Sequence, residues 1–236
     1  MRPRKCAGPH FRAEPLAVLP ADTTAAVAAQ YDPHPYRKQA GKQVKEPPVH
    51  RFDVETLTAG RWRNGGGATR EVVSRPAGTE EFGWRASVAD IDRDGPFSAF
   101  PGVDRTFTLL AGDGVRLACP AFDRLLARVG EPFAFSGEHA PDAQLPAGAC
   151  RVLNIMVRRG RWTAHVHRVA DPVESPLGHA GVLYVLRGRW QAGTDRRVLT
   201  SGQGLWWDSA DNAPTGAVGP LSPDAAALWA DVAPVR

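Results

Sequence analysis

The feature that most restricts the fold of this chain is a series of short runs rich in β-branched and aromatic residues, which starts at Arg51 and continues to the C-terminus. Each run is about five to ten residues long, and Gly, Pro and Asp separate the runs. Short strands at this spacing are typical of β-sandwiches and barrels. We therefore predict an all-β fold, with one brief helical stripe at residues 122–130. The clearest runs are TREVVSR, GWRASVAD, RTFTLLAG, RVLNIMVRRG, RWTAHVHRV and GVLYVLRG.

Two segments of the chain share one form. Residues 105–118, RTFTLLAGDGVRLA, and residues 181–192, GVLYVLRGRWQA, each contain an apolar run, a glycine turn and a second run. This pattern is typical of a β-hairpin. A repeat of this kind within an all-β chain favours two stacked barrels. We expect the first barrel at about residues 51–135 and the second at about residues 150–236.

The first 50 residues differ from the rest in composition. They contain eight prolines, and their eight Lys and Arg against four Asp and Glu account for the whole formal net charge of +4. A segment with this much proline and so few apolar residues has little to build a core from. We predict a mostly disordered, basic, proline-rich extension over residues 1–50, followed by a folded unit over residues 51–236.

The charge of the folded unit limits its partners. Residues 51–236 contain 21 Lys and Arg against 21 Asp and Glu, so the sequence does not indicate the basic patch that nucleic acid requires. The chain has no apolar run approaching the ~18 residues of a membrane helix. Its three cysteines form no CxxC pair, and an odd number without metal spacing favours a reducing compartment. We expect a cytoplasmic protein without membrane or nucleic-acid partners, and exposed sheet edges would permit a homodimer.

The glycine-rich stretch RWRNGGGATR, residues 61–70, is the first candidate for a binding site. Three successive glycines indicate either an unusual backbone or a close approach to bare amides. The stretch lacks the Gly-Lys-Ser/Thr ending of a phosphate-binding Walker loop, but backbone N–H groups beside arginines favour a small anion. The alternative is a strand-connecting loop with ordinary surface polar residues. The candidate ligand-binding residues here are Trp62, Arg63, Asn64, Thr69 and Arg70.

Alternation along two strands supplies further candidates. In GWRASVAD, Trp84, Ala86 and Val88 share one face, while Arg85, Ser87 and Ala89 share the opposite face. Arg105 stands at the start of the run RTFTLLAG, where its neighbour Asp104 is a potential partner. An arginine inside a small barrel is costly unless it is paired or used. Inward orientation of Arg85, Ser87 and Arg105 would therefore indicate a binding site, and outward orientation is the alternative.

Three longer motifs identify a family resemblance. RWRNGGGATREV, DGPFSAFPGVDRT and the N-x-M-x-R-R-G run at residues 154–160 occur in this order, and together they resemble the HutD/Ves family. The resemblance covers about residues 52–232. It implies a bicupin fold, no established enzymatic reaction, and a role in controlling histidine catabolism with formylglutamate as the proposed ligand. The chain departs from the family at Arg63, where lysine is frequent, and at Cys150 and Arg151, where an acidic residue often occurs.

A cupin fold raises the question of a metal. His165 and His167 lie two residues apart on one run, so both imidazoles would share a strand face. No third histidine follows at a suitable position, and catalytic metal sites ordinarily need three protein ligands. We therefore expect no metal and no other cofactor. Our interpretation is a non-enzymatic protein that binds a small carboxylate-bearing metabolite, with a cupin enzyme acting on such a molecule as the alternative and with Asn154, in the second barrel, as the next candidate site.

Overall fold

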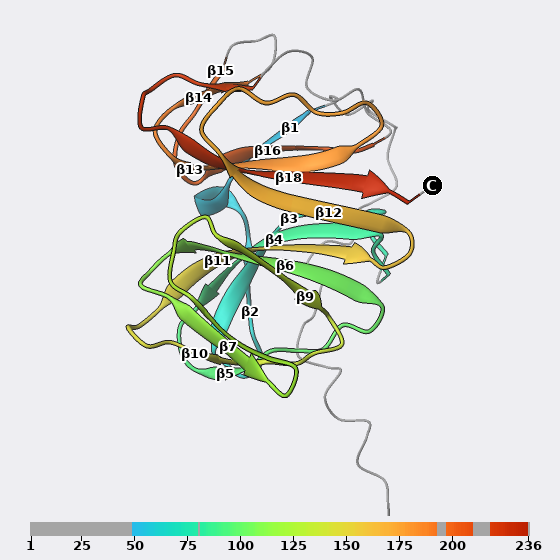
Figure 1. Cartoon of the computed structure of the whole chain (residues 1–236), viewed down its shortest axis with the longest axis vertical. Helices are drawn as coiled ribbons and strands as arrows, with labels where there is room; N and C mark the ends of the chain where they lie inside the picture. The colour runs from blue at the N-terminus through green and yellow to red at the C-terminus, as the bar shows by residue number, and fades with distance from the viewer. Residues whose placement is uncertain (1–48, 80, 193–196, 210–217, 236) are drawn as a thin grey trace, which may run out of the picture.

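The computed structural model describes residues 49–79, 81–192, 197–209 and 218–235. Figure 1 shows that this part of the chain consists of β-strands stacked in layers, which confirms the predicted all-β fold. The extension expected over residues 1–50 lies outside the described residues as far as residue 48, and His50 already begins a strand. The prediction of a brief helical stripe at residues 122–130 was wrong, because residues 122–126 form a strand. No helix in the described ranges is long and apolar enough to cross a membrane.

The upper layers in Figure 1 are a five-stranded and a three-stranded antiparallel sheet. The five-stranded sheet consists, in spatial order, of β1 (His50–Asp53), β16 (Gln203–Trp207), β13 (Ala180–Arg187), β18 (Ala226–Pro234) and β12 (Trp162–Val169). The three-stranded sheet above it consists of β15 (Arg197–Leu199), β14 (Trp190–Ala192) and β17 (Gly219–Pro220).

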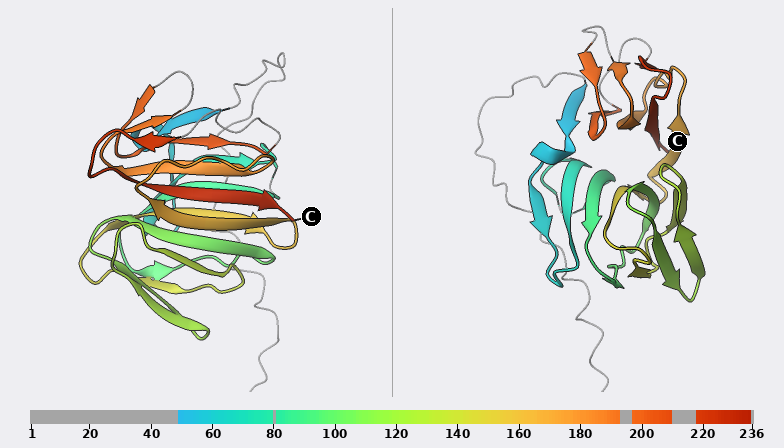
Figure 2. Two further views of the ribbon diagram at one scale, coloured as in Figure 1. Left: turned by 45° about the horizontal axis from the view of Figure 1, so that its top comes forward. Right: turned by 90° about the vertical axis from the view of Figure 1, so that its left-hand side faces the viewer.

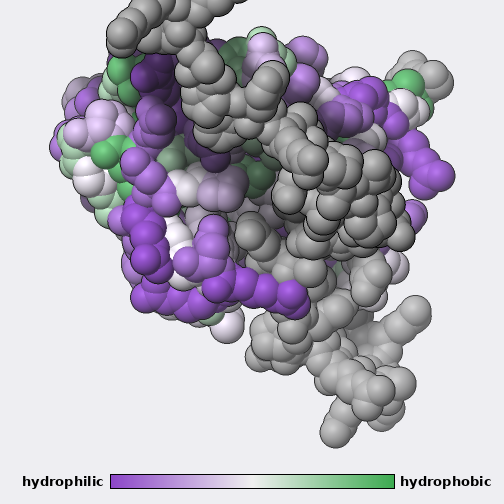
Figure 3. All heavy atoms as spheres, turned by 90° about the horizontal axis from the view of Figure 1, so that it is seen from below, coloured by the Kyte–Doolittle hydropathy of each residue, from purple (hydrophilic) through white to green (hydrophobic). Residues whose placement is uncertain are grey.

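The lower layers are a six-stranded and a four-stranded antiparallel sheet. The six-stranded sheet consists of β2 (Ala59–Arg61), β3 (Gly67–Arg75), β4 (Trp84–Ile91), β11 (Cys150–Arg158), β6 (Val103–Ala111) and β9 (Pro132–Ser136). The four-stranded sheet consists of β5 (Gly95–Pro96), β10 (Asp142–Gln144), β7 (Val115–Cys119) and β8 (Phe122–Leu126). Its exposed strands carry the ion pair between Arg116 and Asp123, and hydrophilic residues border the described surface seen from this end (Figure 3).

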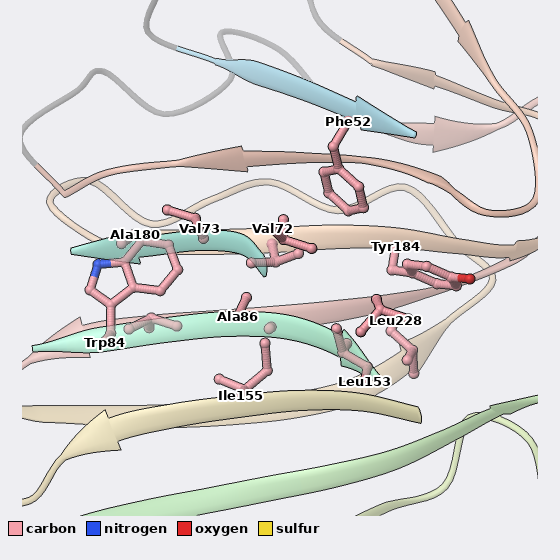
Figure 4. Close-up of a cluster of buried hydrophobic side chains, with 14 of the residues drawn as sticks. Phe52, Val72, Val73, Trp84, Ala86, Leu153, Ile155, Ala180, Tyr184 and Leu228 are labelled. Carbon is pink, nitrogen blue, oxygen red and sulfur yellow. The ribbon is translucent and has the colours of Figure 1, made fainter. Parts of the chain in front are cut away.

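The central core lies between the five-stranded and the six-stranded sheet. Side chains from both sheets gather there, including Trp84 and Ile155 from below and Tyr184 and Leu228 from above (Figure 4). Trp84 and Leu228 are fully buried. Because a buried aromatic or leucine side chain stabilises a fold by about 1.5–3 kcal/mol, this core holds the two inner sheets firmly together.

Each outer sheet closes a second core against its inner neighbour. Trp190 and Trp207 are fully buried between the three-stranded and five-stranded sheets. Phe107 and Leu117 are fully buried between the six-stranded and four-stranded sheets. The chain therefore has three apolar cores separated by two inner sheets, and each inner sheet is covered on both faces.

The repeated segments are not the predicted hairpins. β6 and β7 belong to different sheets, and so do β13 and β14. In both cases the turn carries the chain from an inner sheet to the outer sheet that faces it, because both strands then bury apolar side chains in the same outer core. The two segments do resemble each other, because in each of them the chain crosses from an inner sheet to the facing outer sheet.

The sheets do not follow the expected boundaries of the two barrels. β1 pairs with β16 in the upper half, and the chain then passes through the short 3-10 helix η1 (Val54–Thr56) to the lower half (Figure 2). β11 pairs on both sides with strands of the lower half, β4 and β6. The division into two barrels remains a prediction. The pairing of β11 places Asn154, which lies on this strand, beside residues of β4 and β6.

Candidate functional site

A pocket with a cavity volume of about 70 Å³ lies on the face of the six-stranded sheet that points away from the central core. β4 shows why this face is available: Trp84 enters the central core, whereas Arg85 and Ser87, on alternate positions, line the pocket. Period-two alternation of a strand produces this separation. The volume suffices for several water molecules or one small organic ion.

The floor of the pocket is built from residues that lie opposite one another on neighbouring strands. Met156 on β11 is in register with Arg85 on β4 and with Arg105 on β6. Two residues further along the same face, Asn154 on β11 is in register with Ser87 on β4. Antiparallel pairing of these three strands thus places two guanidinium groups, a hydroxyl and an amide on one floor.

Arg105 is the most unusual of these residues, since only 3% of it is exposed. Its guanidinium makes one long hydrogen bond, to the carbonyl of Ser98 at 3.4 Å, and Nε has no partner within the described part of the chain. The rings of Phe97, Phe100 and Phe135 lie 5.2–5.7 Å from its Cζ atom, which gives cation–π support. Burial, and then the charge of Arg85, lower the pKa of Arg105 to about 10, so it remains charged at neutral pH.

Asp104 does not hold Arg105. Adjacent residues on a strand point to opposite faces, and Asp104 instead accepts hydrogen bonds from Arg159, at 2.7 and 2.9 Å. No carboxylate among the described residues forms an ion pair with Arg105. A charge buried without an anionic partner is expensive, so the Arg105 end of the pocket is suited to an anion from solution.

Arg85 has a different environment, although it is also buried. Its Nε donates a hydrogen bond to Glu71 Oε2 at 2.9 Å. Glu71 lies on β3, in register with Ser87, and its side chain is 39% exposed. One guanidinium of the pocket therefore already has a carboxylate beside it.

Asn154 and Ser87 provide uncharged polar groups between the arginines. Asn154 is 8% exposed, and its Oδ1 atom is buried with no hydrogen-bond partner in the described ranges. Ser87 is 1% exposed and also lines the pocket. Buried polar groups ordinarily have partners, and a bound polar ligand would supply them.

The glycine-rich loop forms one wall of the pocket and is held rigidly. Trp62 Nε1 donates to Thr69 Oγ1 at 2.8 Å, and Gly65 has a left-handed backbone, with φ of 67°. Gly67 is packed so closely against the Asp90 carbonyl and the Trp62 ring that a Cβ atom would collide with them. Gly65 thus shows the unusual backbone, and Gly67 the close packing, that the three glycines indicated.

The loop amides do not form the expected anion nest. The N–H of Gly65 donates to the Trp62 carbonyl at 2.9 Å, and the N–H of Gly66 donates to Asn64 Oδ1 at 2.9 Å. These two donors are engaged within the loop. The loop thus contributes to the pocket through the side chains of Trp62, Asn64 and Thr69.

The structure brings together most, but not all, of the residues predicted from sequence. Arg63 is exposed and does not line the pocket. Arg70 points to the other face of β3, where it pairs with Asp90. The predicted residues that do line the pocket are Trp62, Asn64, Thr69, Arg85, Ser87 and Arg105.

The aromatic wall was not among the residues predicted from sequence, and Asn154, expected in the second barrel, lies on β11 between β4 and β6 of the six-stranded sheet. Phe97 and Phe100, from the loop between β5 and β6, line the pocket together with Asn154 and Met156. The motifs DGPFSAFPGVDRT and N-x-M contain all four residues, and the period-two spacing of Asn154 and Met156 was a usable signal. Their closeness to Arg85 depends on strand pairing between distant parts of the chain.

The chemistry of the lining is suited to an acid. The lining combines N–H and O–H donors with aromatic rings, and none of the described lining residues is a His, Cys, Asp or Glu. His165 and His167 are exposed on β12, in the other half of the molecule. The pocket therefore favours binding of an anion through buried donors.

The fold and the pocket together define a cupin-like β protein with a buried arginine site. Among similar solved structures, HutD from Pseudomonas fluorescens SBW25, obtained in a formate condition, has a TM-score of 0.68 and 24% identity, covering 80% of this chain and 100% of that chain. The HutD family model matches residues 54–220. This chain belongs to the HutD family.

Two further relatives support the assignment of family and fold. Protein Ves from Citrobacter koseri is 44% identical over 159 residues, which are 66% of this chain and 81% of that protein. A cupin 2 conserved barrel domain protein from Leptotrichia buccalis has a TM-score of 0.51 and 11% identity, covering 82% of this chain and 100% of that chain. The second likeness shows the fold alone. The predicted family is confirmed.

Proposed function

We propose that this protein binds a small carboxylate-bearing metabolite in the pocket around Arg105. The observation that carries the proposal is the buried guanidinium of Arg105, which has no carboxylate partner among the described residues. A hydrogen bond between charged groups contributes about 1.5–3 kcal/mol, so a bound carboxylate would offset much of the cost of burying this charge.

The family suggests the biological setting of this binding. The chain belongs to the HutD family, so we propose a regulatory role in histidine utilisation, without catalysis, with formylglutamate as the first ligand to test. We also propose that each inner sheet and its outer partner form one cupin-like barrel, which gives a bicupin. The two outer cores support this division. The free thiols of Cys119 and Cys150 support a cytoplasmic location.

Isothermal titration calorimetry with formylglutamate and other acids of histidine breakdown tests the proposal. Arg105→Met keeps the volume of the side chain and removes the charge, so we expect the affinity of the best acid to fall about ten- to a hundredfold. Arg63→Ala is the matched control, because Arg63 is exposed outside the pocket. It should leave the affinity unchanged.

Two results would count against this function. If no acid binds the parent protein, or if Arg105→Met binds as tightly as the parent does, the pocket is not the site. If the parent protein converts the acid to a product, as followed by NMR, the protein is an enzyme and the alternative function replaces binding.

A further inference from the structure

We infer that Glu71 restricts the pocket to one carboxylate, so that the ligand presents an anionic group to Arg105 and an uncharged polar group to the Arg85 end. The inference rests on the proposed function, and it names the class of ligand: a small acid with an amide or hydroxyl group within the pocket. Glu71 would act as a specificity-determining residue, although it does not itself line the cavity.

The two arginines of the pocket differ in the charges around them. Glu71 Oε2 lies 2.9 Å from Arg85 Nε, and thus places a negative charge at that end. Arg105 is surrounded by aromatic rings instead. A carboxylate at Arg105 meets an uncompensated positive charge, whereas a second carboxylate at Arg85 meets a positive charge already paired with a negative one.

The groups between the arginines match an uncharged partner. Ser87 can donate or accept a hydrogen bond, and Asn154 has a buried oxygen that requires a donor. A carboxylate has no hydrogen to donate to that oxygen at neutral pH, whereas an amide or a hydroxyl has one. A second carboxylate inside the pocket would leave that oxygen without a donor and would meet the negative charge of Glu71, so it is expected to remain outside, in solvent.

Glu71 is well placed for a direct test. Its side chain is 39% exposed, and Glu71→Gln keeps the shape of the side chain and an oxygen that can accept the hydrogen bond from Arg85. The substitution removes one negative charge beside Arg85. The pocket should then accept a second carboxylate more readily.

Succinamate and succinate are suitable probes, because they have the same size and differ in one amide group against one carboxylate. We expect the parent protein to bind succinamate about tenfold more tightly than succinate. Glu71→Gln should reduce this ratio about tenfold, so that the two probes bind with nearly equal affinity. Glu131→Gln is the matched control. Glu131 pairs with Arg124 and Arg128 outside the pocket, and its loss should leave the ratio unchanged.

Calorimetric or NMR titration of the three proteins with both probes separates the outcomes. Equal affinity of the parent for the two probes, or an unchanged ratio in Glu71→Gln, would overturn the selectivity and leave the proposed function intact. Binding of neither probe, together with no binding of any other acid, would overturn the proposed function and the inference with it. A ratio shifted equally by Glu131→Gln would show a general charge effect and would also overturn the inference.

Discussion

Arg85 and Arg105 lie on either side of Met156, each in register with it on the neighbouring strand. Two like charges are thereby held two strand spacings apart, about 9–10 Å between Cα atoms, with the apolar side chain of Met156 between them. The charge of Arg85 adds to the effect of burial in lowering the pKa of Arg105. Because the two positive charges repel each other, an anion bound near them would lower the electrostatic energy of both.

Arg105→Met should stabilise the protein while it weakens binding. Methionine fills a similar volume and removes a buried charge that has no anionic partner among the described residues, so we expect the free energy of unfolding to rise by about 1 kcal/mol. Chemical denaturation in the absence of ligand measures this change. Arg159→Met serves as the contrast: Arg159 bonds Asp104 and Glu138 on the surface, and its loss should not stabilise the fold. A clear loss of stability in Arg105→Met would contradict the prediction.

Alkaline pH should weaken binding and relieve the cost of burying Arg105. The pKa of Arg105 in the folded protein, about 10, lies below the ordinary value for arginine, so above pH 10 the unfolded chain binds more protons at this residue. Its contribution to the free energy of unfolding therefore rises with pH in that range. Affinity for a carboxylate should be constant between about pH 7 and 9 and start to fall as pH approaches about 10, the lowered pKa of Arg105. An affinity that stays constant to pH 11 would contradict this expectation.

Gly67→Ala should destabilise the protein, because the new methyl group would collide with the Asp90 carbonyl and press against the Trp62 ring. Overpacking of this kind costs about 1–3 kcal/mol, and thermal unfolding would measure it. Gly60→Ala is the control on the neighbouring strand, since its methyl group would lie at an ordinary 3.7 Å from the Thr69 carbonyl. Equal melting temperatures for the two variants would show that the loop can shift.

Asp90→Asn should cost about 2 kcal/mol of stability at neutral pH, because Asp90 accepts charged hydrogen bonds from Arg70 and Arg151. Burial raises the pKa of Asp90, but these hydrogen bonds outweigh burial and hold the pKa below its ordinary value of 3.8. The stabilisation by Asp90 is therefore complete above pH 3.8 and is lost as pH falls through the lower folded value. Urea unfolding from pH 7 to pH 3 should show the difference between the variant and the parent narrowing at the acid end.

Cys150 should react with alkylating reagents more slowly than Cys119. Burial, with a smaller contribution from the charge of Asp90, raises the pKa of the Cys150 thiol to about 11, and the thiolate is the reactive form. Cys119 is partly exposed. Labelling at pH 8 followed by mass spectrometry of the peptides checks the order. The denatured protein serves as the control, in which both cysteines should react at the same rate. If the two rates are also equal in the folded protein, the predicted order is wrong.

The sequence predicted the features that depend on neighbours along the chain. Alternation within β4 separated Trp84 from Arg85 and Ser87, and the three glycines indicated a crowded loop. The aromatic wall and the position of Asn154 could not be predicted in this way. Arg85, Arg105 and Met156 come together only through the pairing of strands distant in sequence, and no local pattern specifies which strands pair.

The hairpin prediction was wrong for a related reason. A glycine turn between two apolar runs permits pairing of the runs, but it also permits a step to a facing sheet. β6 and β7 take the second course because their apolar side chains meet across one core. Local turn residues specify where the chain reverses, and packing of the whole domain decides which strand becomes the neighbour.

β11 faces the pocket with Asn154 and Met156 and the central core with Leu153, Ile155 and Val157. Insertion or deletion of one residue in this strand would exchange the two sets, and it would place an amide in the apolar core and leucine in the pocket. A change in what β11 presents to the pocket therefore requires substitution at fixed positions of this strand. The length of β11 is therefore as much a determinant of the pocket as the identity of its side chains.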